Sequence, residues 1–179
     1  MPLIRPRRLA PGQTIGLVAP SSAPNEPDRL RFAAETIESL GFRVRTGKHL
    51  HEREGYLAGS DSARAHDLNA MFADDSIDAI WCVRGGYGAS RLLPLLDYDL
   101  IRRKPKALIG YSDITALHMA IQRHVGLVTF HGPVAWRALP PYTLEGLHRV
   151  LWRTETRCGW PSRRCSSVAR ARWTGTTAW

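Results

Sequence analysis

The sequence lacks any apolar run long enough to cross a lipid bilayer, which excludes a protein anchored by transmembrane helices. Residues 1–8 contain arginine but no apolar stretch behind it, so we expect no signal peptide and a cytoplasmic location, with no membrane partner. The three cysteines are an odd number without metal-ligand spacing, which excludes a disulfide framework. The cysteines thus give no sign of a metal site, and we expect no metal and no cofactor.

Acidic residues are scarce: 16 of them against 25 basic residues give a formal net charge of +9. In a nucleic-acid-binding protein this charge would gather on one structured face. Here more than half of it comes from residues 151–179, which hold six arginines and one glutamate. Residues 1–150 hold 19 basic and 15 acidic residues, so we expect no nucleic-acid partner.

The last segment differs from the rest of the chain in composition. Residues 152–179 contain four of the six tryptophans and two of the three cysteines, and they show no helical or strand period. We therefore expect one domain over 1–150, followed by an aberrant or disordered basic tail over 151–179, such as a frameshift product. A natural basic tail is the alternative, and an intact source-gene reading frame with no longer frame beside it would exclude a frameshift.

The sequence alternates regularly between short apolar runs and longer segments in which apolar residues recur at helical spacing. Short apolar runs predict buried strands, and apolar residues spaced by three or four predict helices. Such an alternation predicts an α/β fold, a parallel sheet with helices on both faces, of the flavodoxin-like or class I glutamine amidotransferase-like kind. The predicted strands are 14–19, 42–45, 77–83, 107–110 and 127–130, and the predicted helices are 28–40, 61–72, 89–96, 113–124 and 143–152.

Parallel sheets bind ligands in the loops that follow the carboxyl ends of their strands. One such loop, after the strand 107–110, reads Tyr111-Ser112-Asp113 and opens a helix. A sharp strand-to-helix turn exposes a serine hydroxyl, and the helix N-terminus favours an oxyanion. We therefore predict Ser112 as a nucleophile, with the backbone N–H of Asp113 as an oxyanion donor; a helix-capping serine is the alternative.

The loop after the preceding strand reads Arg84-Gly85-Gly86-Tyr87-Gly88. Its glycines let the backbone approach a ligand closely, so Gly85 and Gly86 are predicted to supply a second oxyanion donor, unless the loop is an ordinary tight turn. Arg84 is predicted to pair with a substrate carboxylate, or else to be a surface charge. Ser21, after the first strand, is predicted either to bind substrate or to cap a turn.

A serine nucleophile needs a base within hydrogen-bond reach. Of the seven histidines, His131 alone ends a strand beside the predicted turn that carries Ser112. It is a possible base, although a histidine before Gly-Pro is more typical of loop packing.

Together these motifs resemble the LD-carboxypeptidase family of serine peptidases. The matching stretches keep the family's order and spacing within residues 10–150, and they are 18–22, 58–61 with Arg64, 67–69, 77–80 with 84–88, and 109–117. The resemblance implies a Ser-His-Glu peptidase without a metal, cytoplasmic and homodimeric, that releases terminal D-alanine from murein tetrapeptides in cell-wall recycling. A related branch hydrolyses the peptide antibiotic microcin C. The resemblance also implies Ser112 as nucleophile and Asp113, Gly85 and Gly86 as backbone oxyanion donors.

In that family the histidine and glutamate of the triad lie in a second domain, and no residue of this sequence matches them. We therefore expect the family's C-terminal domain to be missing and the chain to be a weak catalyst, because loss of one triad member leaves only residual catalysis. A non-catalytic fragment or ligand-binding domain is one alternative. An amidotransferase-like domain would need cysteine in place of Ser112, and Cys82 is expected to pack in the core.

Overall fold

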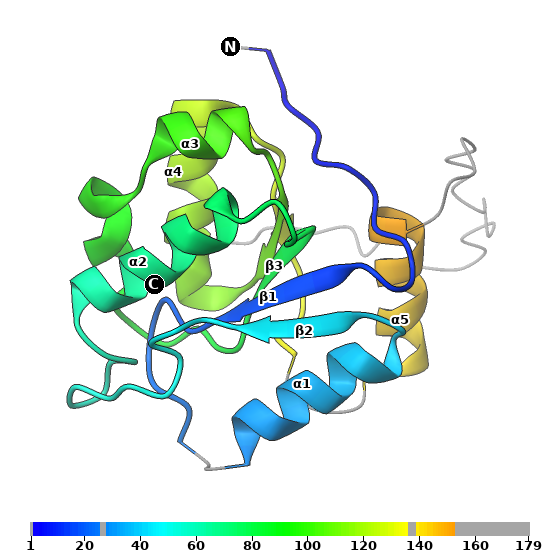
Figure 1. Ribbon diagram of the computed structural model, residues 1–179, viewed down its shortest axis with the longest axis horizontal. Coiled ribbons are helices and arrows are strands. Elements are labelled where there is room, and N and C mark those ends of the chain that lie inside the picture. The colour runs from blue at the N-terminus through cyan, green and yellow to red at the C-terminus, as the bar shows by residue number, and fades with distance from the viewer. Residues whose placement is uncertain (1, 26–27, 136–138, 153–179) are drawn as a thin grey trace, which may run out of the picture.

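A five-stranded parallel sheet forms the centre of the molecule in the computed structural model, which describes residues 2–25, 28–135 and 139–152 (Figure 1). The strands lie in the order β2-β1-β3-β4-β5, which is the flavodoxin-like order. The predicted α/β class and parallel sheet are confirmed. The strands are β1 (Thr14–Val18), β2 (Arg43–Thr46), β3 (Ala79–Cys82), β4 (Ala107–Gly110) and β5 (Phe130–His131).

Helices cover both faces of this sheet. Side chains alternate along a strand, so in β3 Trp81 packs into one core cluster and Ile80 into the other. The cluster that contains Trp81 also holds residues of α1 (Arg29–Ser39) and α5 (Pro141–Leu147). The opposite cluster holds residues of α2 (Asp61–Ala73), α3 (Tyr98–Arg103) and α4 (Thr115–Val125). Figure 1 shows α1 and α2 on opposite sides of the strands.

Local signals in the sequence explain where several elements begin and end. Ser60 caps α2, because its hydroxyl accepts a hydrogen bond from the Ala63 N–H at 3.2 Å. Gly126 ends α4 in a left-handed conformation, with φ of 79°. Lys106 is buried and donates to the carbonyl oxygen of Met71 at 2.8 Å, near the end of α2. Burial lowers the pKa of this lysine, and nearby carboxylates oppose that change.

Four segments differ from the sequence-based expectations, and one of them is the last strand, which was predicted over 127–130 but is found at Phe130–His131. The helix α3 was not predicted, because its six residues are too few to show a period; Asp97 caps it by accepting from the Leu100 N–H at 2.8 Å. The helix predicted over 89–96 is a 3₁₀ segment, η1 (Ala89–Leu95), which contains Pro94. The helix predicted over 143–152 begins at Pro141 and passes into a π-helical turn at His148–Trp152.

The predicted tail lies largely outside the described residues, which reach Trp152. At that end Leu151 is buried and the Trp152 ring packs edge-on against Phe42, with ring centroids 5.3 Å apart. Within the ranges the structure describes, every helix is too short or too polar to span a membrane.

Candidate active site

Three loops meet at the carboxyl edge of the sheet beside the point where strand order reverses, between β1 and β3. They follow β1, β3 and β4, and backbone hydrogen bonds link the first two, since the Ser22 N–H donates to the Gly85 carbonyl at 3.3 Å. In open α/β sheets this edge is where ligands bind. The serine and glycine motifs singled out in the sequence therefore converge on one edge.

Ser112 occupies a strained backbone position at the start of the 3₁₀ turn η2 (Ser112–Ile114). Its φ is +63°, and it is the sole non-glycine residue with positive φ among those the structure describes. This left-handed conformation costs an L-residue roughly 1–2 kcal/mol. Ser112 is also exposed. A strained, exposed serine between a buried strand and a helix has the geometry of a nucleophile elbow.

Glycines make the close packing around this turn possible. A Cβ atom on Gly85 would lie 2.9 Å from the Ser112 Cβ and 3.0 Å from the Tyr111 carbonyl oxygen. A Cβ atom on Gly110 would lie 2.9 Å from the Ile114 side chain and 3.1 Å from the Cys82 Cβ. The glycine-rich loop after β3 therefore lies directly against the elbow, at a distance that a larger residue would not allow.

Backbone donors are available beside the hydroxyl. Among the described residues, no hydrogen-bond acceptor is found for the N–H groups of Asp113 and Gly86. The Asp113 nitrogen would be 3.3 Å from a Cβ on Gly85, so the two loops approach at this point. Gly86 is exposed and has φ of +118°, a conformation that glycine adopts readily. Free N–H groups on two adjoining loops are the kind of donors that stabilise an oxyanion.

The side chain of Asp113 ties the elbow to both neighbouring loops. Its Oδ2 atom accepts hydrogen bonds from the Ser21 hydroxyl and from the Ala89 N–H, the latter at 2.8 Å. Ser21 is fully buried. Its hydroxyl therefore holds Asp113 in place, and the expected substrate contact of Ser21 stays a prediction. The adjacent Ser22 hydroxyl accepts from the Tyr87 N–H at 3.0 Å, which fixes the glycine-rich loop.

Arg64, on α2, forms hydrogen bonds to the loops that follow β1 and β3. Its guanidinium is buried and donates to the carbonyl oxygens of Pro20 at 2.7 Å, Gly88 at 3.0 Å and Gly59 at 3.2 Å. It also forms an ion pair with Asp61. Burial lowers the pKa of Arg64, and the Asp61 carboxylate opposes that change. One planar group with several donors thus joins three separate loops.

Arg84 lies half-buried at the same edge. One guanidinium nitrogen, Nη1, donates to the Ala23 carbonyl at 2.7 Å and to the Asn25 amide oxygen. Within the described ranges, the other two nitrogens have no hydrogen-bond partner. These bonds orient the guanidinium and leave donors for an anionic ligand.

The histidines nearest the elbow do not form a hydrogen bond with Ser112 in the described part of the chain. His131 is level with Gly110 in the β4–β5 register, and its ring centroid lies 6.4 Å from that of Tyr111. His118 is buried behind β4, where its Nε2 bonds to the Gly110 carbonyl oxygen at 3.0 Å. Burial lowers the pKa of His118, so the ring is neutral at neutral pH and Nε2 donates in this bond.

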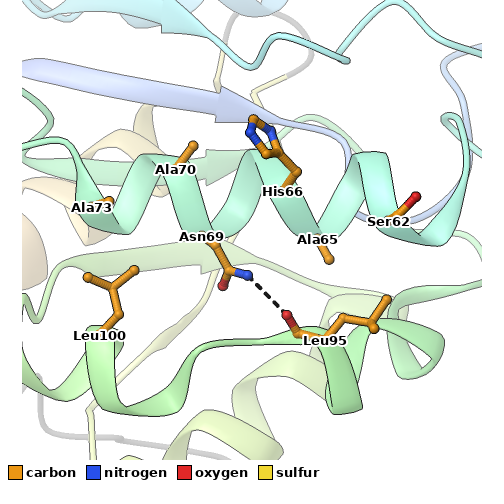
Figure 2. Close-up of a pocket in the computed structure, with 8 residues that line it drawn as sticks. All are labelled: Ser62, Ala65, His66, Asn69, Ala70, Ala73, Leu95 and Leu100. Carbon is orange, nitrogen blue, oxygen red and sulfur yellow. Dashed lines mark hydrogen bonds between the residues drawn. The ribbon is translucent and has the colours of Figure 1, made fainter.

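Two other features do not belong to this edge. Cys82 is buried in the core, and burial raises the pKa of its thiol, which argues against a cysteine nucleophile. A surface hollow of about 480 Å³ lies between α2 and the segment that contains η1 and α3 (Figure 2). Alanine and leucine dominate its lining, and Asn69 donates across it to the Leu95 carbonyl at 3.0 Å. Neither Ser112 nor the glycine-rich loop lines this hollow.

Sequence reasoning missed the supporting polar contacts of the site. Arg64 and Asp113 both stand in motifs that were recognised, but their side-chain partners lie far away in the sequence. The Ser21–Asp113 bond joins residues 92 positions apart, and the Arg64–Pro20 bond joins residues 44 apart. No signal in the local sequence identifies these partners.

Comparison with known proteins gives a consistent assignment. Residues 15–132 match the family description LD-carboxypeptidase N-terminal domain. The chain is 48% identical over 130 residues to the probable murein peptide carboxypeptidase of Bacillus subtilis, covering 73% of this chain and 40% of that protein. It is 35% identical over 156 residues to the microcin C7 self-immunity protein MccF of Escherichia coli, covering 83% and 45%.

A solved structure agrees with these relatives. The MccF-like protein from Bacillus anthracis superposes with a TM-score of 0.78 at 36% identity, covering 83% of this chain and 47% of that one. The chain thus spans about two fifths to one half of the length of the proteins that it matches.

Proposed function

Because this chain belongs to the LD-carboxypeptidase family, we propose that it carries the nucleophile of a serine carboxypeptidase that releases terminal D-alanine from murein tetrapeptides. The observation that carries the proposal is Ser112, exposed at a positive φ between β4 and α4 and packed against Gly85. The relative from Bacillus subtilis, named for murein peptides, supports this substrate class.

The proposed reaction is acyl transfer. The Ser112 Oγ atom attacks the carbonyl carbon of the bond before D-alanine, and its proton passes to a base. The N–H groups of Asp113 and Gly86 stabilise the resulting oxyanion. As the tetrahedral intermediate collapses, the C–N bond breaks and D-alanine leaves as the amine after taking up a proton. Water then hydrolyses the ester on Ser112 and frees the hydroxyl.

The remaining polar groups fit supporting roles in this scheme. Arg84 is placed to bind the carboxylate of the terminal D-alanine through the guanidinium nitrogens that its contacts with Ala23 and Asn25 leave free. Ser21 holds Asp113 in place. The base and its orienting carboxylate, which the family resemblance places in a second domain, are proposed to come from outside the described residues.

A second candidate function is hydrolysis of a microcin-type peptide conjugate. The observation that favours it is the similarity to MccF, which includes 35% sequence identity over 83% of this chain. The same nucleophile and oxyanion donors would serve both substrates. The two functions differ in the leaving group and in what binds beyond the scissile bond.

A substrate panel distinguishes these two functions. The full chain is given murein tetrapeptide ending in D-alanine, its epimer ending in L-alanine, and an aminoacyl sulfamoyl adenosine, with imidazole present as an external base. We expect release of D-alanine at least about 100-fold faster than release of L-alanine, because a misplaced scissile bond costs about that factor. Faster cleavage of the sulfamoyl adenosine would favour the second function, and cleavage of none by a folded chain would contradict both.

A further inference from the structure

Two segments bring three metal-ligating side chains together outside the set of residues assigned to the candidate active site. His49 lies in the turn after β2, whereas His66 and Asp67 are neighbours on α2. One ligand atom from each residue lies within 4.8 Å of the other two. The rings of His49 and His66 meet edge to face, with centroids 5.2 Å apart. In Figure 2 the imidazole of His66 projects from α2 on the side away from Leu95 and Leu100.

The carboxylate of this cluster is held in place by the backbone. Asp67 is buried, and its Oδ2 atom accepts from the His49 N–H at 2.9 Å. Gly47 allows this approach, because a Cβ atom there would overlap the Asp67 carboxylate. The other oxygen, Oδ1, lies 3.6 Å from Nδ1 of His66. Asp67 is therefore a fixed ligand with one oxygen facing an imidazole.

An outer carboxylate orients His49 in the manner common at metal sites. The Glu52 Oε1 atom lies 2.6 Å from Nδ1 of His49, so a proton is held between them. Metal-binding histidines usually donate their second ring N–H to such a carboxylate, which fixes the tautomer and the ring orientation.

We propose that His49, His66 and Asp67 bind a zinc ion, with Glu52 as the outer partner of His49. Two imidazoles and one carboxylate are a ligand set that zinc favours, and three protein ligands leave a coordination position for water. Zinc–ligand distances of about 2.0–2.1 Å require neighbouring ligand atoms to be about 3.3 Å apart in a tetrahedral site. The ligand atoms lie within 4.8 Å of one another, and the His66 side chain, which is 57% exposed, has room to move toward the other two.

The position of this site gives the ion a structural role. It joins α2 to the segment 47–60, whose far end lies against the loop after β1. There the Ala23 N–H donates to the Tyr56 carbonyl at 2.9 Å, and the Ala58 N–H donates to the Ser21 carbonyl at 3.1 Å. Zinc would therefore restrain the segment that supports Ser21, whose hydroxyl is bonded to Asp113 beside Ser112.

Zinc titration of the full chain against a chromophoric chelator tests the proposal. We expect one equivalent of zinc to bind, and His66→Ala to weaken binding about 100-fold or more through loss of a direct ligand. Glu52→Gln, which keeps the side-chain size, should weaken binding about 10-fold, as loss of an outer partner does. His124→Ala, an exposed histidine on α4, is the matched control and should bind zinc as the wild type does.

Cobalt substitution gives a second readout, because ligands change its visible spectrum. Cobalt bound by two imidazoles and a carboxylate should give tetrahedral bands without thiolate charge transfer, and His66→Ala should abolish them. Equal zinc affinity in His66→Ala and His124→Ala would overturn the proposal. So would thiolate charge transfer, which would assign the metal to the cysteines of residues 153–179, and so would a wild-type chain that binds no zinc.

Discussion

Replacement of Ser112 by alanine is expected to lower the rate of D-alanine release, measured with imidazole as the added base, to the residual rate that binding alone supports. The reason is that removal of a nucleophile abolishes the covalent route and leaves only what binding and the oxyanion donors supply. D-alanine release measured under saturating substrate, together with thermal unfolding of both proteins, checks the prediction. Ser90→Ala is the matched control, because Ser90 is exposed in η1, close to the site in sequence.

Substitutions of Ser112 should also change the free energy of unfolding. Ser112→Gly is expected to raise the free energy of unfolding by about 1 kcal/mol while abolishing activity, because glycine removes the cost of the left-handed conformation. Ser112→Ala, which keeps a Cβ atom, should leave stability nearly unchanged. Chemical denaturation of the three proteins gives the comparison. A glycine variant less stable than the alanine variant would show that the turn is not strained.

Replacement of Arg64 by methionine should lower the free energy of unfolding by about 3 kcal/mol or more, because each buried acceptor left without its donor costs about 1–3 kcal/mol. Methionine fills similar space but donates no hydrogen bond. The carbonyl oxygens of Pro20, Gly59 and Gly88 would then be left without the donor that now joins them. Unfolding by urea, followed by circular dichroism, measures the change.

Two variants test whether this effect comes from the hydrogen bonds that Arg64 donates to the three carbonyl oxygens. Arg31→Met removes an exposed arginine that pairs with Glu35 on α1, and it should leave the free energy of unfolding nearly unchanged. Arg64→Lys keeps the charge but loses the planar fork, so it should fall between wild type and Arg64→Met. If Arg64→Met destabilised the protein no more than Arg31→Met does, the hydrogen bonds of Arg64 would not contribute to stability as proposed.

The sheet could be predicted because local signals and global packing agree in this sequence. Each buried strand is a short apolar run, and each long helix carries both an apolar face and an end signal, such as Ser60 before α2 or Gly126 after α4. The helix α3 was not predicted because its six residues give less than two turns of periodicity. The reason is physical: short helices depend on tertiary packing and capping more than on their own pattern.

The candidate site was predictable in its backbone but not in its side-chain contacts. A serine between a buried strand and a helix identifies the turn, and glycines identify where the chain must pack closely. The burial of Ser21 and its bond to Asp113 could not be predicted, because burial depends on neighbours that the local sequence does not reveal. The cluster of His49, His66 and Asp67 was invisible for the same reason, since a loop and a helix contribute its members.

The most direct test of the account is acylation of Ser112 by an activated ester, with imidazole supplied as the base that the described residues do not place there. Nitrophenolate release gives the rate, and peptide mapping by mass spectrometry locates the acyl group. We predict one acyl group per chain, on Ser112, at a rate that rises with imidazole and is lost in Ser112→Ala. Equal acylation of the Ser112→Ala protein, or acyl groups spread over other side chains, would contradict Ser112 as the nucleophile.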